Sequence, residues 1–446
     1  MDQILPDQET PSLNFIKGAV DTLKDVQDKS SWASCSAIVQ EQVSDALGAR
    51  NLSFLFGAGC SSLMEKDEVL EDLLPAEEKG IPTMAPLAAG FKGLFGGEAK
   101  ASVTNEEIEA LTNVLGIDLK DEAFSKNLER LLEVLLATKV FADTSNSSAI
   151  KAAKTHLESV IGKVITYVTE ACSKPKLAEN SNPVFALYQK FYQRLVLRDR
   201  TLPRPWVFTT NYDLFSERAM DRLSIPYCNG FSGSVEQRLN PATFRYALAE
   251  QLDITSKRWA AVDSFVYLCK LHGSINWVED GEGLFPIRAL QDVPATDADH
   301  RVMIYPTPAK QNTSFGAPYS DLFREFQKQV VQDQSVLIIA GYGFGDEHVN
   351  NLVFQALTIP GFRLVIFGDP DLNEVTKTLG NLEDPRIWFI WGEGPEGGMK
   401  AHYFKTIVEH FLPAGPGNRT DHAVEKALKA FGVLAGKKDG GEADAG

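Results

Sequence analysis

Continuous apolar runs recur along the chain and are separated by longer amphipathic stretches. These runs predict buried strands at residues 52–56, 206–210, 265–273, 301–307, 335–346, 362–370 and 386–392. Strands that are covered by helices on both faces lack polar alternation. The stretches 318–332 and 346–357 are long enough for right-handed crossover helices. The pattern therefore predicts an α/β fold with a parallel sheet flanked by helices.

A largely helical insertion is expected between the first two of these strands, at about residues 100–204. Thr104 and Glu107 have the spacing of a capping box at a helix start. Apolar positions then recur at the three- and four-residue spacing of an amphipathic helix. These positions are Leu128, Leu131, Leu132, Leu135 and Leu136. Further helices are expected at 148–172 and 183–197.

The two ends of the chain are expected to differ from the central part at residues 51–412. Residues 1–50 are predicted to form a helical preface, because apolar positions recur at helical spacing. Those positions include Leu13, Ile16, Val20 and Leu23. Residues 413–446 are expected to form a C-terminal helix and a disordered tail, since the last twelve residues are small, polar and glycine-rich.

Composition narrows the classes of function. The chain has 44 Lys and Arg against 60 Asp and Glu, a formal charge of -16, which disfavours direct binding of nucleic acid. Its 5 cysteines form no C-x-x-C pair, which indicates a reducing compartment and no zinc ribbon. The sequence contains no apolar window of membrane-spanning length and no signal-peptide pattern. We therefore expect a cytoplasmic protein that is not bound to a membrane.

Several predicted strands end in glycine-rich or polar sequence. In a parallel sheet, ligands bind beyond the carboxyl ends of the strands, where loops and helix N-termini converge. The candidate binding residues are Gly57, Ala58, Gly59, Cys60, Ser61, Thr209, Thr210, Asn211, Asp213, His272, Gly273, Ser274, Gly341, Gly343 and Asp369. Glycines after the first strand let a backbone approach a pyrophosphate closely, and amides at a helix start favour its negative charge.

Each of these patterns also has a plainer interpretation. The Gly57–Ser61 stretch can be an ordinary β–α turn, and it differs from the G-x-G-x-x-G form of dehydrogenases. Asn211 and Asp213 can cap the helix that follows them, and Asp346 can do the same for the next helix. His272 alone can be a buried histidine that closes a strand. Found together and in this order, the motifs indicate a function more specifically than each motif does alone.

The combined motifs resemble those of the sirtuin-like family of NAD-consuming proteins. The turn G-A-G-x-S corresponds to residues 57–61, T-x-N-x-D to 209–213, and the H-G pair to 272–273. The stretch GIPTM at 80–84 is similar to the family's element after the first turn. The loops at 341–353 and 365–370 are similar to ribose-contacting loops of bacterial sirtuin-like defence proteins. The resemblance covers about 51–400 and implies a Rossmann-like domain.

Two departures from sirtuin deacylases favour another branch of that family. The chain has no cysteine pairs for the four-cysteine zinc site, and Thr210 stands where deacylases have glutamine. The resemblance then implies an NAD hydrolase that releases nicotinamide and ADP-ribose without a metal. Proteins of this branch act in antiphage defence and abortive infection by depleting NAD. A protein deacylase or ADP-ribosyl transferase is the less favoured alternative.

The expected chemistry assigns three catalytic residues. Asn211 holds the ribose and a water near the anomeric carbon, and His272 accepts a proton near neutral pH. Asp213 orients this pair or the loop beside it. Gly57, Gly59 and Ser61 are expected to hold the pyrophosphate, while Gly341, Gly343 and Asp369 receive the adenosine portion.

The activity is expected to be gated, because a freely active NAD hydrolase is toxic. The helical insertion offers surface for a homo-oligomer. The family resemblance also implies a separate HerA-like hexameric ATPase as partner, and the chain itself has no G-x-x-x-x-G-K-[ST] motif. An NAD-binding assembly subunit without catalysis remains the main alternative.

Overall fold

The computed structural model describes most of the chain between residues 13 and 413. The described ranges are 13–26, 31–62, 80–97, 99, 101–173, 182–253, 258–279, 286–291, 301–303, 319–396 and 398–413. The expected C-terminal helix and tail at 413–446 therefore lie outside the described residues, except for Pro413.

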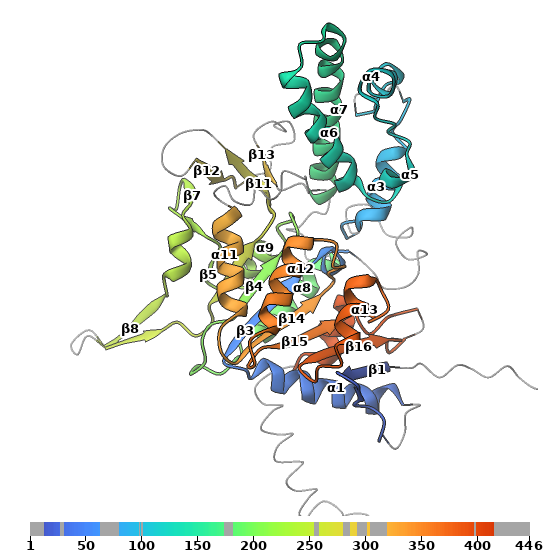
Figure 1. Ribbon diagram of the computed structural model, residues 1–446. Helices are drawn as coiled ribbons and strands as arrows, with labels where there is room; N and C mark the ends of the chain where they lie inside the picture. The colour runs from blue at the N-terminus through green and yellow to red at the C-terminus, as the bar shows by residue number, and fades with distance from the viewer. Residues whose placement is uncertain are drawn as a thin grey trace, which may run out of the picture.

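A nine-stranded sheet forms the centre of the described part of the chain, in the order β2-β1-β16-β15-β14-β3-β4-β10-β5 (Figure 1). Seven of its strands run parallel: β3 (Asn51–Phe56), β4 (Trp206–Thr209), β5 (Tyr227–Cys228), β10 (Val266–Lys270), β14 (Ser335–Ala340), β15 (Arg363–Phe367) and β16 (Ile387–Gly392). Six of the seven predicted strand regions supply six of these strands, and the short β5 was not predicted. The predicted α/β fold with a parallel sheet is confirmed.

The beginning of the expected helical preface is a strand instead. Strands β1 (Leu13–Lys17) and β2 (Val20–Asp21) pair antiparallel at one edge of the main sheet. Strand β1 also pairs antiparallel with β16. Leu13 and Phe15 are buried, which is the alternation of a half-buried strand and not a helical period. The helix of this region begins later, as α1 (Trp32–Leu47).

Helices cover both faces of the sheet, as the continuous apolar strands require. One face packs on α1, α8 (Pro183–Leu195), α9 (Phe215–Arg222) and the turn α14 (Phe404–Thr406). The other packs on α11 (Tyr319–Val330), α12 (Glu347–Leu357) and α13 (Glu374–Asn381). Successive residues of β3 point to opposite faces, with Phe54 and Phe56 in the first core and Leu55 in the second. The core thus fixes the sheet from both sides.

A helical region that begins earlier than the insertion predicted at about 100–204 projects from the sheet in Figure 1, whereas α8 near the end of that range packs on the sheet. The projecting region contains α3 (Met84–Lys92), α4 (Asn105–Leu115), α5 (Glu122–Ser125), α6 (Leu128–Thr144) and α7 (Ser148–Ser173). The capping box of Thr104 and Glu107 is present at the start of α4. Even α7, with 26 residues, is not apolar enough to cross a membrane, and the same holds for every other helix in the described residues.

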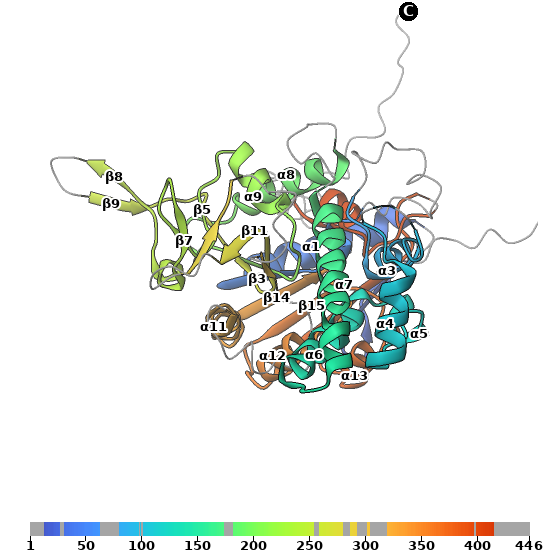
Figure 2. The ribbon, with the colours of Figure 1, turned by 90° about the horizontal axis from the view of Figure 1, so that it is seen from above.

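Two small antiparallel sheets stand apart from the main sheet and were not predicted. One joins β13 (Arg301–Met303), β11 (Gly273–Glu279), β12 (Ile287–Ala289), β7 (Gln237–Leu239) and β6 (Phe231–Ser232). The other is the hairpin of β8 (Ala249–Asp253) and β9 (Arg258–Ala261), which projects from the molecule in Figure 2. The predicted strand at 301–307 therefore belongs to a small sheet, and its residues 304–307 lie outside the described part.

Candidate functional site

Four neighbouring strands end at one level of the sheet. Phe56 of β3 lies opposite Ala340 of β14 and Thr209 of β4, and Thr209 lies opposite Lys270 of β10. Ligands of parallel sheets bind at such an edge. The residues that directly follow these ends are Gly57, Thr210, Asn211, Leu271, His272 and Gly341. The structure thus brings the predicted motifs together at the carboxyl edge of the sheet.

Asn211 and His272 occupy equivalent positions on adjacent strand ends. Each lies two residues beyond the paired Thr209 and Lys270. The backbone ladder continues past the strands, since Leu271 N donates to Thr209 O at 2.8 Å. The sixty residues between Asn211 and His272 in the sequence therefore do not separate the two strand ends in the fold.

The glycines of the first turn permit a close approach between two loops. A Cβ atom on Gly57 would lie 2.5 Å from both Gly341 O and Tyr342 Cα, and one on Gly59 would lie 2.8 Å from Gly341 Cα. Gly59 N donates to Gly341 O at 2.9 Å. Gly341 itself has a φ of 62°, which favours glycine. The first turn therefore makes a tight backbone contact with the 341–342 loop, and its contact with a pyrophosphate stays a prediction.

The remaining amides of this turn are largely used within it. Residues Ala58–Cys60 form a 3-10 turn, and the amides of Cys60 and Ser61 donate to Gly57 O and Ala58 O at 3.0 Å each. Ala58 is exposed. The thiol of Cys60 is buried against Ala340 O at 3.2 Å, and burial raises its pKa well above the usual range. The Cys60 thiol therefore points into the fold, and binding of a cofactor at Cys60 stays a prediction.

Asn211 is held by three hydrogen bonds at the end of β4. Its Nδ2 donates to Gly57 O at 2.9 Å and to Ser61 Oγ at 3.0 Å. Its backbone N donates to Thr209 Oγ1 at 3.0 Å. Both Nδ2 hydrogens are thus engaged, which leaves Oδ1 as the acceptor that can face a ligand. Thr209 and Thr210 support this geometry, the latter by donating its N–H to Phe56 O at 3.1 Å.

Ser61 and Asp213 face each other in a buried network. Ser61 Oγ donates to Asp213 Oδ2 at 2.7 Å, and it lies 2.9 Å from Tyr188 OH of α8. Asp213 Oδ1 accepts from Phe215 N at 3.0 Å, at the start of α9. Asp213 thus holds the loop that carries Asn211, whereas its catalytic role and the contact of Ser61 with a pyrophosphate stay predictions.

His272 forms a buried pair with Asp346. The two side chains are 6% and 7% exposed, and His272 Nε2 lies 2.7 Å from Asp346 Oδ2. Asp346 also caps α12, since its Oδ1 accepts from His348 N at 2.9 Å and Val349 N at 3.2 Å. A carboxylate opposite Nε2 favours the tautomer with the proton on Nε2 and leaves Nδ1 as the basic nitrogen. The sequence identified Asp346 only as a possible cap, because 74 residues separate the pair.

Gly273 and Ser274 lie where the chain turns from the main sheet into β11. Gly273 has a φ of 82°, in the region that favours glycine, and it begins β11. Ser274 is fully buried, and its Oγ donates to Tyr212 O at 3.1 Å and accepts from Lys270 Nζ at 2.8 Å. Ser274 thus has internal partners, and binding of a cofactor by Gly273 and Ser274 stays a prediction. Lys270 was not singled out by the sequence patterns.

The loops after β14 and β15 form the more open part of the site. A Cβ atom on Gly343 or Gly345 would meet no atom within 4 Å in the described residues. Asn373, the N-cap of α13, donates through Nδ2 to Gly343 O at 2.9 Å, which joins the two loops. Asp369 is half-buried, and its Oδ1 accepts from Asp371 N at 2.8 Å. This part of the edge is where the larger portion of a dinucleotide has room.

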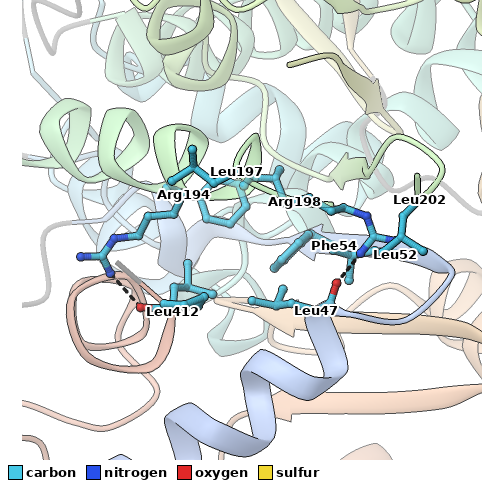
Figure 3. A pocket seen from close by; sticks show the side chains of 11 residues that line it. Leu47, Leu52, Phe54, Arg194, Leu197, Arg198, Leu202 and Leu412 are labelled. Carbon is cyan, nitrogen blue, oxygen red and sulfur yellow. Dashed lines mark hydrogen bonds between the residues drawn. The ribbon is translucent and has the colours of Figure 1, made fainter. Parts of the chain in front are cut away.

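Two pockets in the described part of the chain lie at the opposite edge of the sheet. The first, of about 60 Å³, is shown in Figure 3, where Arg194 and Arg198 point to backbone oxygens of Leu412 and Leu47. It is lined by Leu52 and Phe54 of β3 among other apolar side chains, and it is too small for a nucleotide. The second lies around Asn51 and Trp206, near the first residues of β3 and β4. In the described residues no group of three or more His, Cys, Asp or Glu side chains could hold a metal ion.

Comparison with known proteins supports part of the resemblance. A family model described as SIR2-like domain matches residues 205–381. This segment contains Asn211, His272 and Asp346 but begins after the Gly57–Ser61 turn. Over these residues the chain is similar to the SIR2-like family. No curated protein matches the sequence.

Solved structures of Sir2 homologues show a weak overall similarity. One is a triple mutant in complex with 2′-O-acetyl ADP ribose, with 14% identity, a TM-score of 0.31, and coverage of 77% of this chain and 94% of that chain. Another is a histidine-to-asparagine mutant in complex with ADP ribose, with 12% identity, a TM-score of 0.30, and the same coverage of 77% and 94%.

Proposed function

We propose that the chain is an NAD hydrolase that cleaves the bond between nicotinamide and ribose. The single observation that carries this proposal is the pair of side chains at adjacent strand ends. Asn211 offers its Oδ1 and is held by the hydrogen bonds of its Nδ2. His272 offers its Nδ1 and is held by the hydrogen bond of its Nε2. An acceptor and a base at one sheet edge, within a SIR2-like segment, fit hydrolysis of an N-glycosidic bond.

The proposed reaction needs positioning more than proton donation to the leaving group. The bond between the anomeric carbon and the nicotinamide nitrogen breaks, and its electron pair neutralises the pyridinium ring. Water attacks the oxocarbenium-like carbon and gives its proton to His272, which passes it to solvent. Asp346 stabilises the protonated imidazole, and Asn211 Oδ1 orients the water or a ribose hydroxyl. The products are nicotinamide and ADP-ribose.

NAD is the proposed substrate, and the site fits it unevenly. The open loops at Gly343 and Asp369 suit the adenosine portion, since a carboxylate acceptor matches a ribose diol. The turn at 57–61 offers fewer free amides than expected, because those of Gly59, Cys60 and Ser61 already have backbone acceptors. The pyrophosphate is therefore held by the exposed Ala58 amide and by the later loops, not by the whole turn.

The biological role that we propose is antiphage defence through NAD depletion in the cytoplasm. A toxic activity requires gating, either by homo-oligomer assembly or by a partner such as a HerA-like hexameric ATPase. Val140 and Phe141 near the end of α6 are 65% and 59% exposed, and they give the helical insertion an apolar contact surface. The activity itself is proposed to need no metal.

Nicotinamide release by purified variants tests the catalytic assignment. Asn211→Ala and His272→Ala are each expected to lower the rate by ~10²-fold or more, because positioning and general-base catalysis are typically worth this much. Circular dichroism and thermal melting control for folding. Near-full activity in both folded variants would contradict the proposal.

One observation favours a second candidate, an NAD-binding subunit that assembles without catalysis. The helical insertion exposes Val140 and Phe141 by 65% and 59%, and apolar side chains of this kind suit contacts between subunits. Such a chain would bind NAD and release no nicotinamide. Calorimetric binding of NAD together with chromatography of the products separates the two functions.

A further inference from the structure

A buried lysine lies beneath the turn that carries Asn211. Lys270, the last residue of β10, has a side chain that is 2% exposed. Its Nζ lies 3.1 Å from Glu217 Oε1 and donates to Ser274 Oγ at 2.8 Å. It also donates to the backbone oxygens of Asp213 and, at 3.3 Å, Tyr212. Four acceptors thus surround an ammonium group that has three N–H donors.

These contacts join the two segments of the candidate site. The oxygens of Tyr212 and Asp213 belong to the turn directly after Asn211, whereas Ser274 lies two residues after His272. Ser274 Oγ and Ile275 N also donate to Tyr212 O, at 3.1 Å and 3.0 Å. Lys270 is therefore the cation on which both segments converge.

The partner carboxylate is enclosed as well. Glu217 lies in α9, and its side chain is 12% exposed. Burial raises the pKa of Glu217, and the charge of Lys270 opposes that rise. Its Oε2 makes no hydrogen bond to any described residue. A buried ion pair with an unsatisfied oxygen contributes little net stability, because desolvation offsets the attraction. A contribution to stability alone therefore does not explain why Lys270 and Glu217 are buried together.

We propose that Lys270 is a positioning residue that fixes Asn211 and His272 relative to each other. This inference rests on the proposed NAD hydrolysis and deepens it. Lys270 acts through the turn at 212–213 and through Ser274, and it does not touch the substrate. Misplacement of a reacting group by about 1 Å can cost ~10²-fold in rate. Lys270 and its four acceptors keep the distance between Asn211 and His272 constant.

Removal of one or both charges separates positioning from stability. Lys270→Met leaves Glu217 buried without its partner, so the melting temperature is expected to fall. The double variant Lys270→Met with Glu217→Leu removes both charges and is expected to recover the melting temperature. Its kcat is expected to stay ~10²-fold below wild type with KM changed by less than about threefold, because binding groups remain while the alignment is lost.

A matched control lies in the helical insertion. Lys163 forms a similarly enclosed pair with Glu107 at 2.7 Å, far from the strand ends in the sequence and on α7. Lys163→Met is expected to lower the melting temperature and to leave kcat unchanged. If the Lys270→Met and Glu217→Leu double variant regains both stability and kcat, Lys270 is only a structural residue and the inference is overturned.

Hydrogen exchange separates failure of this inference from failure of the proposed function. In the stable double variant, peptides that cover 209–216 and 271–276 are expected to exchange faster than in wild type, while the peptides of α12 do not change. If wild type releases no nicotinamide, the proposed function fails, and exchange in these two peptides alone decides the role of Lys270. Wild-type protection in both peptides overturns it.

Discussion

At the scale of single residues, the contact between His272 and Asp346 decides which nitrogen of the imidazole can act as the base. Asp346 uses one carboxylate oxygen for the histidine and the other for the start of α12. The two tasks can be separated by substitution, because asparagine is as good a helix cap as aspartate but carries no charge.

Asp346→Asn is expected to keep the melting temperature and to lower NAD hydrolysis by ~10²-fold or more, since the imidazolium loses its counter-charge. Glu347→Gln removes a charge from an exposed neighbour at the same helix terminus and serves as the control. Steady-state nicotinamide release and thermal melting measure the two effects. An active Asp346→Asn variant would show that the pair only stabilises the helix.

Gly343 gives a second test at this scale. A methyl group there meets no atom within 4 Å in the described residues, so Gly343→Ala is expected to fold normally. If adenosine lies over this loop, the added methyl group raises KM for NAD several-fold and changes kcat little. Gly345→Ala is the control, since it is equally open and is not assigned to the substrate. Equal KM values in wild type and Gly343→Ala would remove this loop from the binding site.

The positions of site residues in the fold could be predicted only for residues that directly follow the end of a strand. The sequence placed Asn211 and His272 correctly at one sheet edge, because parallel strands end together. It could not predict that Ser61 bonds to Asp213 or that His272 meets Asp346, since these contacts depend on side-chain directions across separate loops. The burial of Lys270 could not be predicted, because a lysine at the end of an apolar strand is usually exposed to solvent.

At the scale of elements, backbone contact between two loops holds the site together. The turn at 57–61 and the loop at 341–342 pack so closely that side chains have no room at Gly57 and Gly59. The sequence predicted a glycine-rich turn after the first strand correctly. It could not identify the partner of that turn, because the second loop lies more than 280 residues away.

Gly57→Ala is expected to destabilise the protein by about 1–3 kcal/mol, because its Cβ would lie 2.5 Å from backbone atoms that cannot move freely. Gly162→Ala is the matched control. Gly162 lies within α7 and its Cβ would meet no atom within 4 Å in the described residues, so alanine there is expected to stabilise by about 0.5–1 kcal/mol. Denaturant unfolding measures both. A neutral Gly57→Ala would show that the loops can separate without cost.

Periodicity predicted long elements better than short ones. Helices at 148–173 and 183–195 agree with their amphipathic patterns, and the capping box marked the start of α4. The edge strand β1 was expected to be helical, because five residues satisfy a period of two and a period of 3.6 almost equally. Pairing with β16 decides the outcome.

At the scale of the whole molecule, burial separates the thiols from the surface. Cys35, Cys60, Cys172 and Cys269 are buried, whereas Cys228 is half-buried. Burial raises the pKa of Cys172 to about 12 and raises those of Cys60 and Cys269 well above the usual range. Thiols in this state are neutral near pH 7.5 and react slowly.

Iodoacetamide at pH 7.5 is therefore expected to modify Cys228 first in the folded protein and to leave NAD hydrolysis unchanged. Mass spectrometry of tryptic peptides gives the order of modification, and denatured protein provides the control in which all thiols react. Rapid modification of Cys60 together with loss of activity would show that the first turn opens readily.

The overall architecture was predictable because its strands are continuous apolar runs. The two small sheets were not, since their strands are short and lie in segments of mixed polarity. The assembly that we propose for gating depends on surfaces of the helical insertion, and sequence patterns specify such surfaces poorly.

Incubation of the purified chain with NAD alone tests the central claim most directly. Chromatography is predicted to show nicotinamide and ADP-ribose in equal amounts, with turnover that depends on Asn211 and His272. Binding of NAD without any release of nicotinamide, both over a range of protein concentrations that includes the assembled state and with a HerA-like hexameric ATPase added, would contradict the account.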